Sequence, residues 1–335
     1  MGISSNASYV EKQRNKGKTM DELLRVEGLK KYFKTPHGLL HAVDDVDFSI
    51  SKGETLGVVG ESGCGKSTLG RVVIKLLPAT DGEVYFKGEE ILAQKDSIKL
   101  RKSLQMIFQD PFSSLNPRMT VGEIIGEPMR INKICPKGEI DERVSSLMDT
   151  VGLASRYVNY YPHELDGGRR QRIGIARALA LEPEFIVCDE PVSALDVSIQ
   201  AQIINLMQDL QEERGFSYMF ITHDLSVVRH ISNNIMVMYM GKVVEKAPTE
   251  ELFSNTIHPY TKALLAAIPL PVVHKGEIER PILRGEITSP IDPKPGCRFA
   301  SRCPVATDMC KEKTPCLVEI RKSHVVACHR AKEFV

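Results

Sequence analysis

The chain has 335 residues, which is enough for one large α/β domain and a small appendage. Its 44 lysines and arginines balance 43 aspartates and glutamates, and the resulting net charge of +1 argues against nucleic acid as the main partner. No run of 18 apolar residues is present, which excludes a membrane-spanning helix.

Residues 1–22 are predicted to form a flexible N-terminal tail. The stretch is largely polar and lacks the apolar core of a signal peptide. Five of the eight cysteines lie between Cys297 and Cys328. Because no secretion signal is visible, this local cluster favours a metal centre over a disulfide framework.

Four strands and one helix are predicted in the first 90 residues. Leu23–Phe33 and Leu40–Ile50 alternate apolar and polar residues around a Pro-His-Gly turn, a pattern typical of antiparallel strands. An apolar run at Thr55–Val59 and a short segment at Gly82–Phe86 predict further strands. Ser67–Leu77 has the periodicity of a helix.

The middle of the chain predicts a helical insertion followed by alternating strands and helices. From residue 111 to about 165 the strand signal fades, and Val121–Met129 and Glu142–Val151 have helical patterns. Beyond the insertion, buried strands are predicted at Phe185–Cys188, Tyr218–Thr222 and Ile235–Tyr239, and helices at Gln171–Leu181, Ile199–Arg214 and Leu225–Ile231. Such alternation predicts a mostly parallel sheet.

A change of composition predicts a domain boundary. After Ile268-Pro269-Leu270-Pro271 the chain turns to proline, glycine and charged residues, as in a linker. We therefore expect a main domain at 23–270 and a Cys-rich C-terminal domain at 271–335.

A glycine-rich loop joins the strand at Thr55–Val59 to the helix that follows. It fits the pattern G-x-x-x-x-G-K-[ST] with the residues Gly60, Glu61, Ser62, Gly63, Cys64, Gly65, Lys66 and Ser67. Its glycines allow backbone N–H groups to point at phosphate oxygens, while Lys66 reaches the β- and γ-phosphates and the Ser67 hydroxyl can ligate Mg²⁺. The positive end of the helix dipole adds to this attraction. The loop therefore predicts a site for a nucleoside triphosphate.

Cys64 has two interpretations. It lies beside Lys66 at the start of a helix, a setting that lowers the pKa of a thiol. Packing of a small side chain is the favoured role.

Two carboxylates end a predicted core strand. Asp189 and Glu190 follow Phe185–Cys188, at the edge where parallel sheets carry ligands. Asp189 would hold Mg²⁺, and Glu190 would orient or deprotonate the attacking water. Taken alone, the two acids fit the start of an ordinary loop equally well. Together with the glycine-rich loop they favour ATP hydrolysis.

The segment before the predicted helix at Gln171–Leu181 indicates the kind of ATPase. Its residues are Leu165, Asp166, Gly167, Gly168 and Arg169. With the glycine-rich loop and the two carboxylates, the set resembles the ATP-binding subunits of ABC transporters over residues 23 to 270. The resemblance implies an α/β fold, a P-loop NTPase of the ABC ATPase type. This type has a mixed sheet core, an antiparallel β subdomain and a helical insertion, here at about 111–168.

The resemblance also implies roles for single residues. Tyr32 would stack on adenine, Gln109 would sense Mg²⁺ and water, and His223 would contact the γ-phosphate. The implied catalytic residues are Glu190, His223, Lys66 and Gln109. The implied Mg²⁺ ligands are Ser67, Gln109 and Asp189, and the implied D-loop is Ser193, Ala194, Leu195 and Asp196. The residues implied to bind ATP are Tyr32, Gly60, Glu61, Ser62, Gly63, Cys64, Gly65, Lys66, Ser67 and Thr68. Taken alone, Tyr32, Gln109 and His223 also fit ordinary packing or a loop position.

The signature segment departs from the family pattern Leu-Ser-Gly-Gly-Gln at two positions. Asp166 stands where serine bonds the γ-phosphate held by a partner chain, and Arg169 replaces glutamine. A carboxylate about 4 Å from phosphate costs on the order of 4 kcal/mol per unit charge at intermediate dielectric, of which Arg169 offsets a part. Aspartate is nevertheless a good N-cap, so the helix should form normally. We expect a weakened ATP site capped by this chain, and a non-identical ATPase partner with an intact signature.

The C-terminal part of the chain indicates which branch of the family the sequence resembles. Residues 109–118 and 258–269 resemble oligopeptide and dipeptide importer ATPases of the peptide/nickel branch, and so does the tail. The resemblance implies an ATPase that drives peptide import at the cytoplasmic face of the membrane. The implied partners are a second ATPase chain, two transmembrane permease subunits and, indirectly, an extracytoplasmic peptide-binding protein. The cargo is left open.

The cysteines of the tail have the spacing C-x5-C-x6-C-x5-C-x11-C, without the C-x2–4-C pairs of zinc knuckles. Wide spacing of four thiolates suits an iron–sulfur cluster, and zinc or simple reduced thiols are the alternatives. The family resemblance assigns Cys297, Cys303, Cys310 and Cys328 as ligands of a [4Fe–4S] centre. Cys316 does not match the pattern.

Two other functions fit the same residues. A non-transport ABC ATPase would act on DNA or ribosomes, and the balanced charge argues against it. A redox- or iron-sensing regulator would use the cysteines to govern the ATPase. Comparing ATPase activity with the cluster oxidised, reduced and absent would separate a regulator from a structural staple.

Overall fold

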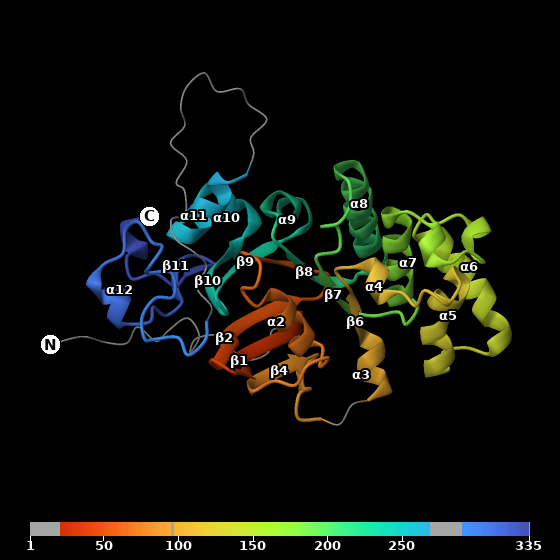
Figure 1. Ribbon diagram of the computed structural model, residues 1–335, viewed down its shortest axis with the longest axis horizontal. Coiled ribbons are helices and arrows are strands. Elements are labelled where there is room, and N and C mark those ends of the chain that lie inside the picture. Colours follow the sequence, from red (N-terminus) through yellow and green to blue (C-terminus); the bar gives the residue numbers. More distant parts are fainter. Residues whose placement is uncertain (1–20, 95–96, 269–289, 335) are drawn as a thin grey trace, which may run out of the picture. The chain divides into compact units, whose positions relative to one another are not determined.

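The computed structural model describes residues 21–94, 97–268 and 290–334 (Figure 1). The chain divides into two compact units. The first unit comprises the described parts of Met1–Ser51, Thr55–Ala93 and Thr222–Val335, and the second comprises Lys52–Glu54 and Gln94–Ile221. All but the last two residues of the predicted tail, and the predicted linker as far as residue 289, lie outside the described residues.

An antiparallel sheet in the first unit has the strand order β2-β1-β4-β5. Its strands are β1 (Glu22–Thr35), β2 (Gly38–Ser51), β4 (Asp81–Phe86) and β5 (Glu89–Glu90). Leu24 of β1 pairs with Ile50 on one side and Phe86 on the other, and all three side chains are buried. The strands predicted at Leu23–Phe33, Leu40–Ile50 and Gly82–Phe86 are confirmed as β1, β2 and β4.

A second sheet in the first unit has the order β11-β12-β10-β9-β3. Its strands are β3 (Thr55–Val59), β9 (Asn234–Tyr239), β10 (Lys242–Pro248), β11 (Val318–Arg321) and β12 (His324–Val326). β3 and β9 pair in parallel, whereas the pairs from β9 to β11 are antiparallel. The sequence prediction missed β10, β11 and β12. Through β12, which pairs Val326 with Glu245, the end of the chain becomes part of this sheet.

The helices of the first unit are α2 (Lys66–Val73), α9 (Leu225–Ile231), α10 (Thr249–Ser254), α11 (Pro259–Ala266), α12 (Asp308–Glu312) and the 3₁₀ turn η4 (Ala331–Glu333). α2 is shorter than the predicted Ser67–Leu77. It ends because Lys75 takes a left-handed φ of 61° and the N–H groups of Leu76 and Leu77 both turn back to the carbonyl of Arg71.

The second unit contains a three-stranded parallel sheet and a set of helices. Its strands are β6 (Leu104–Ile107), β7 (Phe185–Asp189) and β8 (Ser217–Thr222), in the order β8-β7-β6. Its helices are α3 (Ile98–Ser103), α4 (Pro111–Ser114), α5 (Val121–Asn132), α6 (Ile140–Thr150), α7 (Gly167–Leu179) and α8 (Val197–Arg214), with 3₁₀ turns η1 (Lys137–Glu139), η2 (Ser155–Tyr157) and η3 (Pro162–Glu164). Every residue of β7 and β8 is buried, as expected of strands covered on both faces.

The predicted helical insertion is confirmed as α4 to α6, packed beside α7 (Figure 1). α5 begins with a capping box, in which Thr120 and Glu123 bond each other's backbone N–H. The apolar positions Ile124, Ile125 and Met148 are buried. No helix of the described residues is long and apolar enough to cross a bilayer.

The described C-terminal residues 290–334 fall within the first unit. Phe299 is buried against Tyr239 of β9 and Tyr260 of α11, with ring centroids 5.2 and 5.4 Å away. A bridge between Ile291 and Leu40 joins the same segment to β2. The C-terminal segment thus shares the apolar core of the first unit.

Candidate nucleotide site

The glycine-rich loop lies between β3 and α2 in the first unit. Gly65 is the N-cap of α2 with a φ of 106°, and a Cβ there would lie 1.9 Å from the carbonyl oxygen of Ala42. A Cβ on Gly60 would meet the carbonyl oxygen of Met238 at 2.2 Å. Both positions therefore require glycine, because a side chain would collide with neighbouring backbone.

Lys66 is the first residue of α2 and is buried. Its Nζ donates to the carbonyl oxygens of Gly60, at 2.7 Å, and Glu61, at 2.9 Å. The ammonium group thus sits within the curl of the loop, where a cation meets phosphate oxygens in P-loop proteins.

Cys64 is buried, and the prediction that its setting lowers the thiol pKa is wrong. Burial raises the pKa of Cys64 and outweighs the opposing charge of Lys66. The sulfur atom of Cys64 lies only 2.8 Å from the point that a Cβ on Gly60 would occupy, so the thiol packs directly against this glycine. A packing role for Cys64 agrees with this burial.

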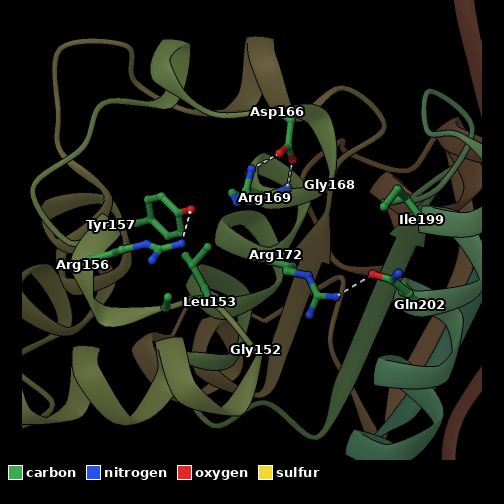
Figure 2. Close-up of a pocket in the computed structure, with 11 residues that line it drawn as sticks. Gly152, Leu153, Arg156, Tyr157, Asp166, Gly168, Arg169, Arg172, Ile199 and Gln202 are labelled. Atoms are coloured by element: carbon green, nitrogen blue, oxygen red, sulfur yellow. Dashed lines mark hydrogen bonds and ion pairs between the residues drawn. The ribbon is translucent and has the colours of Figure 1, made fainter.

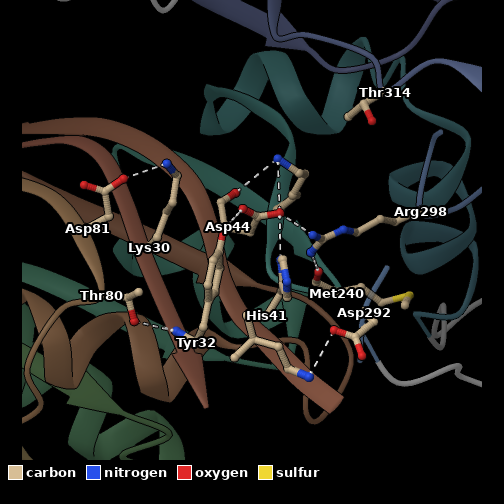
Figure 3. A network of polar contacts seen from close by, with 12 residues as sticks. Lys30, Tyr32, His41, Asp44, Thr80, Asp81, Met240, Asp292, Arg298 and Thr314 are labelled. Atoms are coloured by element: carbon tan, nitrogen blue, oxygen red, sulfur yellow. Dashed lines mark hydrogen bonds and ion pairs between the residues drawn. The ribbon is translucent and has the colours of Figure 1, made fainter. Parts of the chain in front are cut away.

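Tyr32 lies on β1 among polar side chains (Figure 3). Its ring stacks on that of His41, with centroids 4.0 Å apart and 25° between the planes. Its hydroxyl donates to Asp44 Oδ1 at 2.5 Å, and burial together with this bond raises the pKa of Tyr32. The ring is therefore held in place, with His41 covering one face.

Asp44 is the centre of this network (Figure 3). It forms an ion pair with Arg298 and lies 3.5 Å from Nζ of Lys242. Burial alone would raise the pKa of Asp44, but the hydroxyl of Tyr32 and the two cations lower it. Arg298 also donates to the carbonyl oxygen of Met240. The carboxylate is therefore ionised and connects β2 to the C-terminal segment.

Glu61 of the glycine-rich loop is held by groups far away in the sequence. Both of its carboxylate oxygens accept from Arg302, at 2.7 and 3.0 Å. Its backbone N–H donates to the hydroxyl of Tyr260 at 2.9 Å. Tyr260, Arg298 and Arg302 lie in segments that resemble importer ATPases, but no pattern in the sequence shows that they support the loop, so the sequence analysis missed this role.

In the second unit, Asp189 and Glu190 end β7 as predicted. Asp189 is fully buried, and Glu190 follows with a left-handed φ of 47°. Gln109 Nε2 donates to Glu190 Oε2 at 3.0 Å. Since Ile107 of β6 pairs with Cys188 of β7, the residues two positions further along the parallel strands lie side by side. The structure thus brings together two of the predicted catalytic residues.

The predicted D-loop, Ser193 to Asp196, leads into α8, whose N-cap is Asp196. Its backbone is held by Gln200, whose Nε2 donates to the carbonyl oxygens of Val192 and Leu195, both at 3.0 Å. Ser193 Oγ donates to the carbonyl oxygen of Glu190 at 3.1 Å. Gln200 is a supporting residue that the sequence analysis did not identify.

The predicted signature segment begins α7 and contributes to a pocket of about 280 Å³ (Figure 2). Asp166 is the N-cap, accepting from the backbone N–H of Arg169 at 2.8 Å, and its carboxylate also forms an ion pair with that side chain. The expectation that aspartate caps this helix is confirmed. A Cβ on Gly168 would lie 2.7 Å from Ile199 of α8, which explains why glycine stands there.

The remaining predicted residues are divided between the units. Ser67, Thr68 and His223 belong to the first unit, and Gln109 and Asp189 to the second. His223 is exposed directly after β8, before the N-cap Asp224 of α9. Each unit thus presents its own part of the predicted site.

The four predicted cluster cysteines influence one another electrostatically. Burial, with smaller contributions from Cys310, Cys303 and Cys328, raises the pKa of Cys297 to about 11. The backbone N–H of Cys297 donates to the carbonyl oxygen of Cys310 at 2.7 Å, whereas Cys316 is exposed. Among residues 21–94, 97–268 and 290–334, no group of three or more His, Cys, Asp or Glu side chains is arranged to hold a metal ion.

Two family models match the chain. The model described as ABC transporter matches residues 43–193, and the model described as oligopeptide/dipeptide transporter, C-terminal region, matches residues 244–310. The first spans the glycine-rich loop, the signature segment and the two carboxylates, and the second includes three of the clustered cysteines.

Curated relatives are similar over most of their length. The chain is 52% identical to the oligopeptide transport ATP-binding protein AppF of Bacillus subtilis, over 92% of this chain and 97% of the relative. It is 60% identical to OppF of the same organism over 75% of this chain and 84% of the relative. OppF of Salmonella typhimurium is 51% identical over 89% of this chain and 90% of the relative.

Solved structures share the fold. The ATP-binding cassette MJ0796, in a dimeric post-hydrolysis state bound to ADP and Pi, superposes with a TM-score of 0.61 at 29% identity, over 68% of this chain and 99% of that one. The cbiO1 protein of Clostridium perfringens, part of the ABC transporter complex cbiONQ, gives 0.62 at 29% identity, over 70% and 91%.

Proposed function

The chain belongs to the ATP-binding subunits of ABC transporters, in their oligopeptide/dipeptide branch, and from this premise we propose that it hydrolyses ATP to energise peptide import. The observation that carries the proposal is the similarity to oligopeptide transport ATP-binding proteins across the cassette and the C-terminal region together. The catalytic contact between Gln109 and Glu190 gives it a chemical basis.

Binding of ATP is assigned to residues of the first unit. The backbone N–H groups of residues 60–68 and the ammonium of Lys66 attract the phosphates, and Tyr32 offers its ring to adenine. Mg²⁺, when bound, neutralises charge on the phosphates, and Ser67, Gln109 and Asp189 are the residues proposed to hold it. A hydroxyl, an amide and a fully buried carboxylate suit that ion, because it prefers oxygen ligands.

Hydrolysis is assigned to Glu190. Its carboxylate would orient or deprotonate the attacking water, Gln109 would fix the carboxylate through the bond at 3.0 Å, and His223 would contact the γ-phosphate. The protein thereby supplies position and electrostatics, which are the main contributions to phosphoryl transfer.

The working form is proposed to be a dimer with a second ATPase chain of different sequence. Asp166 and Arg169 replace the serine and glutamine of the family pattern, and their ion pair occupies the start of α7. An ATP bound to the partner would face this pair, while the ATP on Lys66 would face an intact signature. We therefore expect the site on this chain to be the hydrolytic one.

The remaining partners follow from peptide import. Two transmembrane permease subunits would receive the motion of α4 to α6, and an extracytoplasmic protein would deliver the peptide. The chain would act at the cytoplasmic face of the membrane, as a main domain at 23–270 and a Cys-rich region at 271–335. Purification of the assembly from native membranes, followed by identification of its chains, tests these partners.

The direct test of function is peptide uptake by proteoliposomes that contain the complete transporter. With ATP inside, labelled peptide should accumulate, and Glu190→Gln should abolish accumulation. Glu182→Gln is the matched control, because Glu182 is an exposed acid of the same unit, paired only weakly with Arg143 at 3.4 Å. Accumulation without ATP, or unchanged uptake by Glu190→Gln, would contradict the proposal.

A [4Fe–4S] cluster on Cys297, Cys303, Cys310 and Cys328 is a finer proposal. Cys310 is buried and the other three cysteines are partly buried, and neighbouring thiols raise the pKa values of Cys297, Cys303 and Cys328, which supports the proposal. Because the described side chains are not arranged around a metal ion, the four sulfur atoms would have to move together to hold a cluster. Four soft sulfur donors suit iron–sulfur or zinc. A brown anaerobic preparation containing iron and acid-labile sulfide is expected. A colourless protein with stoichiometric zinc would contradict it.

A further inference from the structure

Two arginines of the C-terminal segment reach the part of the first unit that is assigned to ATP. Arg298 directly follows Cys297 and Arg302 directly precedes Cys303, with Phe299 between the two arginines, and their side chains are only 8% and 6% exposed. Each is paired with a carboxylate from the N-terminal part of the chain, Asp44 or Glu61. Such buried pairs are costly to break, because removal of one partner leaves the other charge uncompensated.

Arg302 acts on the phosphate side. Its guanidinium forms two parallel bonds with Glu61, a geometry that fixes the direction of the carboxylate as well as its distance. The carbonyl oxygen of the same Glu61 accepts from Lys66 at 2.9 Å. Arg302 thereby neutralises a negative charge on the loop that would repel phosphate, and it holds the backbone that carries the lysine.

Arg298 acts on the adenine side. It pairs with Asp44, which in turn accepts from the hydroxyl of Tyr32 (Figure 3). It also donates to the carbonyl oxygen of Met240, and the next residue, Gly241, donates to the carbonyl oxygen of Cys64 at 2.8 Å. Loss of Arg298 would remove one of the cations that hold Asp44, and Asp44 is the acceptor that fixes the hydroxyl of Tyr32.

We propose that Arg298 and Arg302 are positioning residues for ATP, through which the C-terminal segment sets the adenine contact of Tyr32 and the phosphate contact of the Glu61–Lys66 loop separately. The inference rests on the proposed ATP site. The C-terminal segment is therefore part of the nucleotide-binding machinery, and its two arginines serve different parts of the nucleotide.

Two ligands separate the two arginines. ATP engages both sides of the site, whereas inorganic tripolyphosphate engages the phosphate side alone. Each ligand is titrated in the presence of Mg²⁺ into the full chain assembled in its transporter complex. Arg302→Ala should weaken both ligands about tenfold or more, because it exposes phosphate to an unpaired carboxylate. Arg298→Ala should weaken ATP about fivefold and change tripolyphosphate by less than about twofold.

Additional substitutions distinguish a positioning role of Arg302 from a general loss of structure. In the Arg302→Ala background, Glu61→Gln removes the unpaired charge and should restore much of the tripolyphosphate affinity. Arg302→Lys should lie between wild type and Arg302→Ala, because lysine keeps the charge without the two-bond geometry. Arg302→Lys also tests the proposal if Arg302→Ala fails to fold.

Arg321→Ala is the matched control. Arg321 belongs to the same C-terminal segment and pairs with Glu251 at 3.2 Å, away from both carboxylates. It should leave the affinity for both ligands unchanged. Three results would overturn the proposal: Arg302→Ala within twofold of wild type for both ligands, equal weakening of both ligands by Arg298→Ala, or no rescue by Glu61→Gln. If the wild-type chain binds neither ligand, the proposed ATP site itself is wrong.

Discussion

The two units hold their functional residues in opposite ways. In the second unit, Gln109 and Glu190 meet because neighbouring parallel strands end at one edge, and Asp166 is placed by the first turn of its own helix. In the first unit, Glu61 and Asp44 are held by arginines more than 240 residues away in the sequence. The contacts in the second unit thus arise from its own parallel strands and helix start, whereas those in the first unit depend on the C-terminal segment.

Gly65→Ala should have the largest effect on ATP binding, because the glycine-rich loop is closely packed against neighbouring backbone at this residue. The added Cβ would lie 1.9 Å from the carbonyl oxygen of Ala42, at a φ of 106° that disfavours any side chain. We expect ATP binding to be lost, as measured by calorimetric titration. Gly63→Ala is the control in the same loop, with a positive φ and open space around the Cβ, and should weaken binding far less. Similar effects of the two substitutions would show that close packing does not shape the loop.

His258 makes the first unit sensitive to acid. Burial lowers the pKa of His258 to about 4, below the ordinary value near 6.5, so the unfolded chain takes up the proton first as pH falls. Stability is complete above pH 6.5 and falls between pH 6.5 and 4 by about 3 kcal/mol. Urea unfolding across this range should show a smaller loss for His258→Asn, which keeps a capping side chain for α11. Replacement of the exposed His37 by Asn should leave the dependence of the unfolding free energy on pH as in the wild type. If His258→Asn also leaves that dependence unchanged, burial of His258 is not the cause of the acid sensitivity.

Gln200→Ala tests the local support of the second unit. The side chain holds the D-loop by two hydrogen bonds, so its removal should loosen residues 193–196 by about 1–2 kcal/mol. Hydrogen exchange of those amides should accelerate. Gln202→Ala on the same helix, which contacts Arg172 rather than the D-loop, should leave the exchange unchanged. Equal protection in both variants would mean that the D-loop is held by other contacts.

Asp166 should give the smallest effect on stability. Asp166→Ala removes an N-cap and should cost about 1 kcal/mol, whereas Asp166→Ser keeps a cap. In a heterodimer, Asp166→Ser should also raise turnover at the ATP site that this chain caps, because a carboxylate next to phosphate is removed. ATPase assays in a Glu190→Gln background, in which the ATP site on this chain is inactivated, measure that turnover. No increase would count against the proposed asymmetry.

The contrast between the units explains how much of the molecule could be predicted from the sequence. The strands named in the sequence analysis and the helical insertion follow from local patterns, since apolar runs and polarity alternation act over a few residues. The contact of Gln109 with Glu190 was not predicted, because the two residues are 81 positions apart and meet through β6, which the sequence analysis missed. The antiparallel addition of β10 to β12 could not be predicted, because its pairing partners lie some 80 residues apart, as with Glu245 and Val326.

The arginine contacts were also beyond prediction. Arg298 and Arg302 lie in the part of the tail that resembles importer ATPases, but no pattern in the sequence indicates Asp44 and Glu61 as their partners, which are 254 and 241 positions away. The thiol pKa of Cys64 was predicted in the wrong direction because its neighbour Lys66 is visible in the sequence, whereas its burial is not.

The most direct test of the account measures ATP affinity and single-turnover hydrolysis together in Lys66→Ala and Glu190→Gln. Lys66→Ala should lose affinity, because the ammonium within the loop is removed. Glu190→Gln should keep affinity and lose about 10²–10⁴-fold in the rate of hydrolysis, the usual contribution of a general base. Wild-type affinity in Lys66→Ala, or wild-type turnover in Glu190→Gln, would contradict the account.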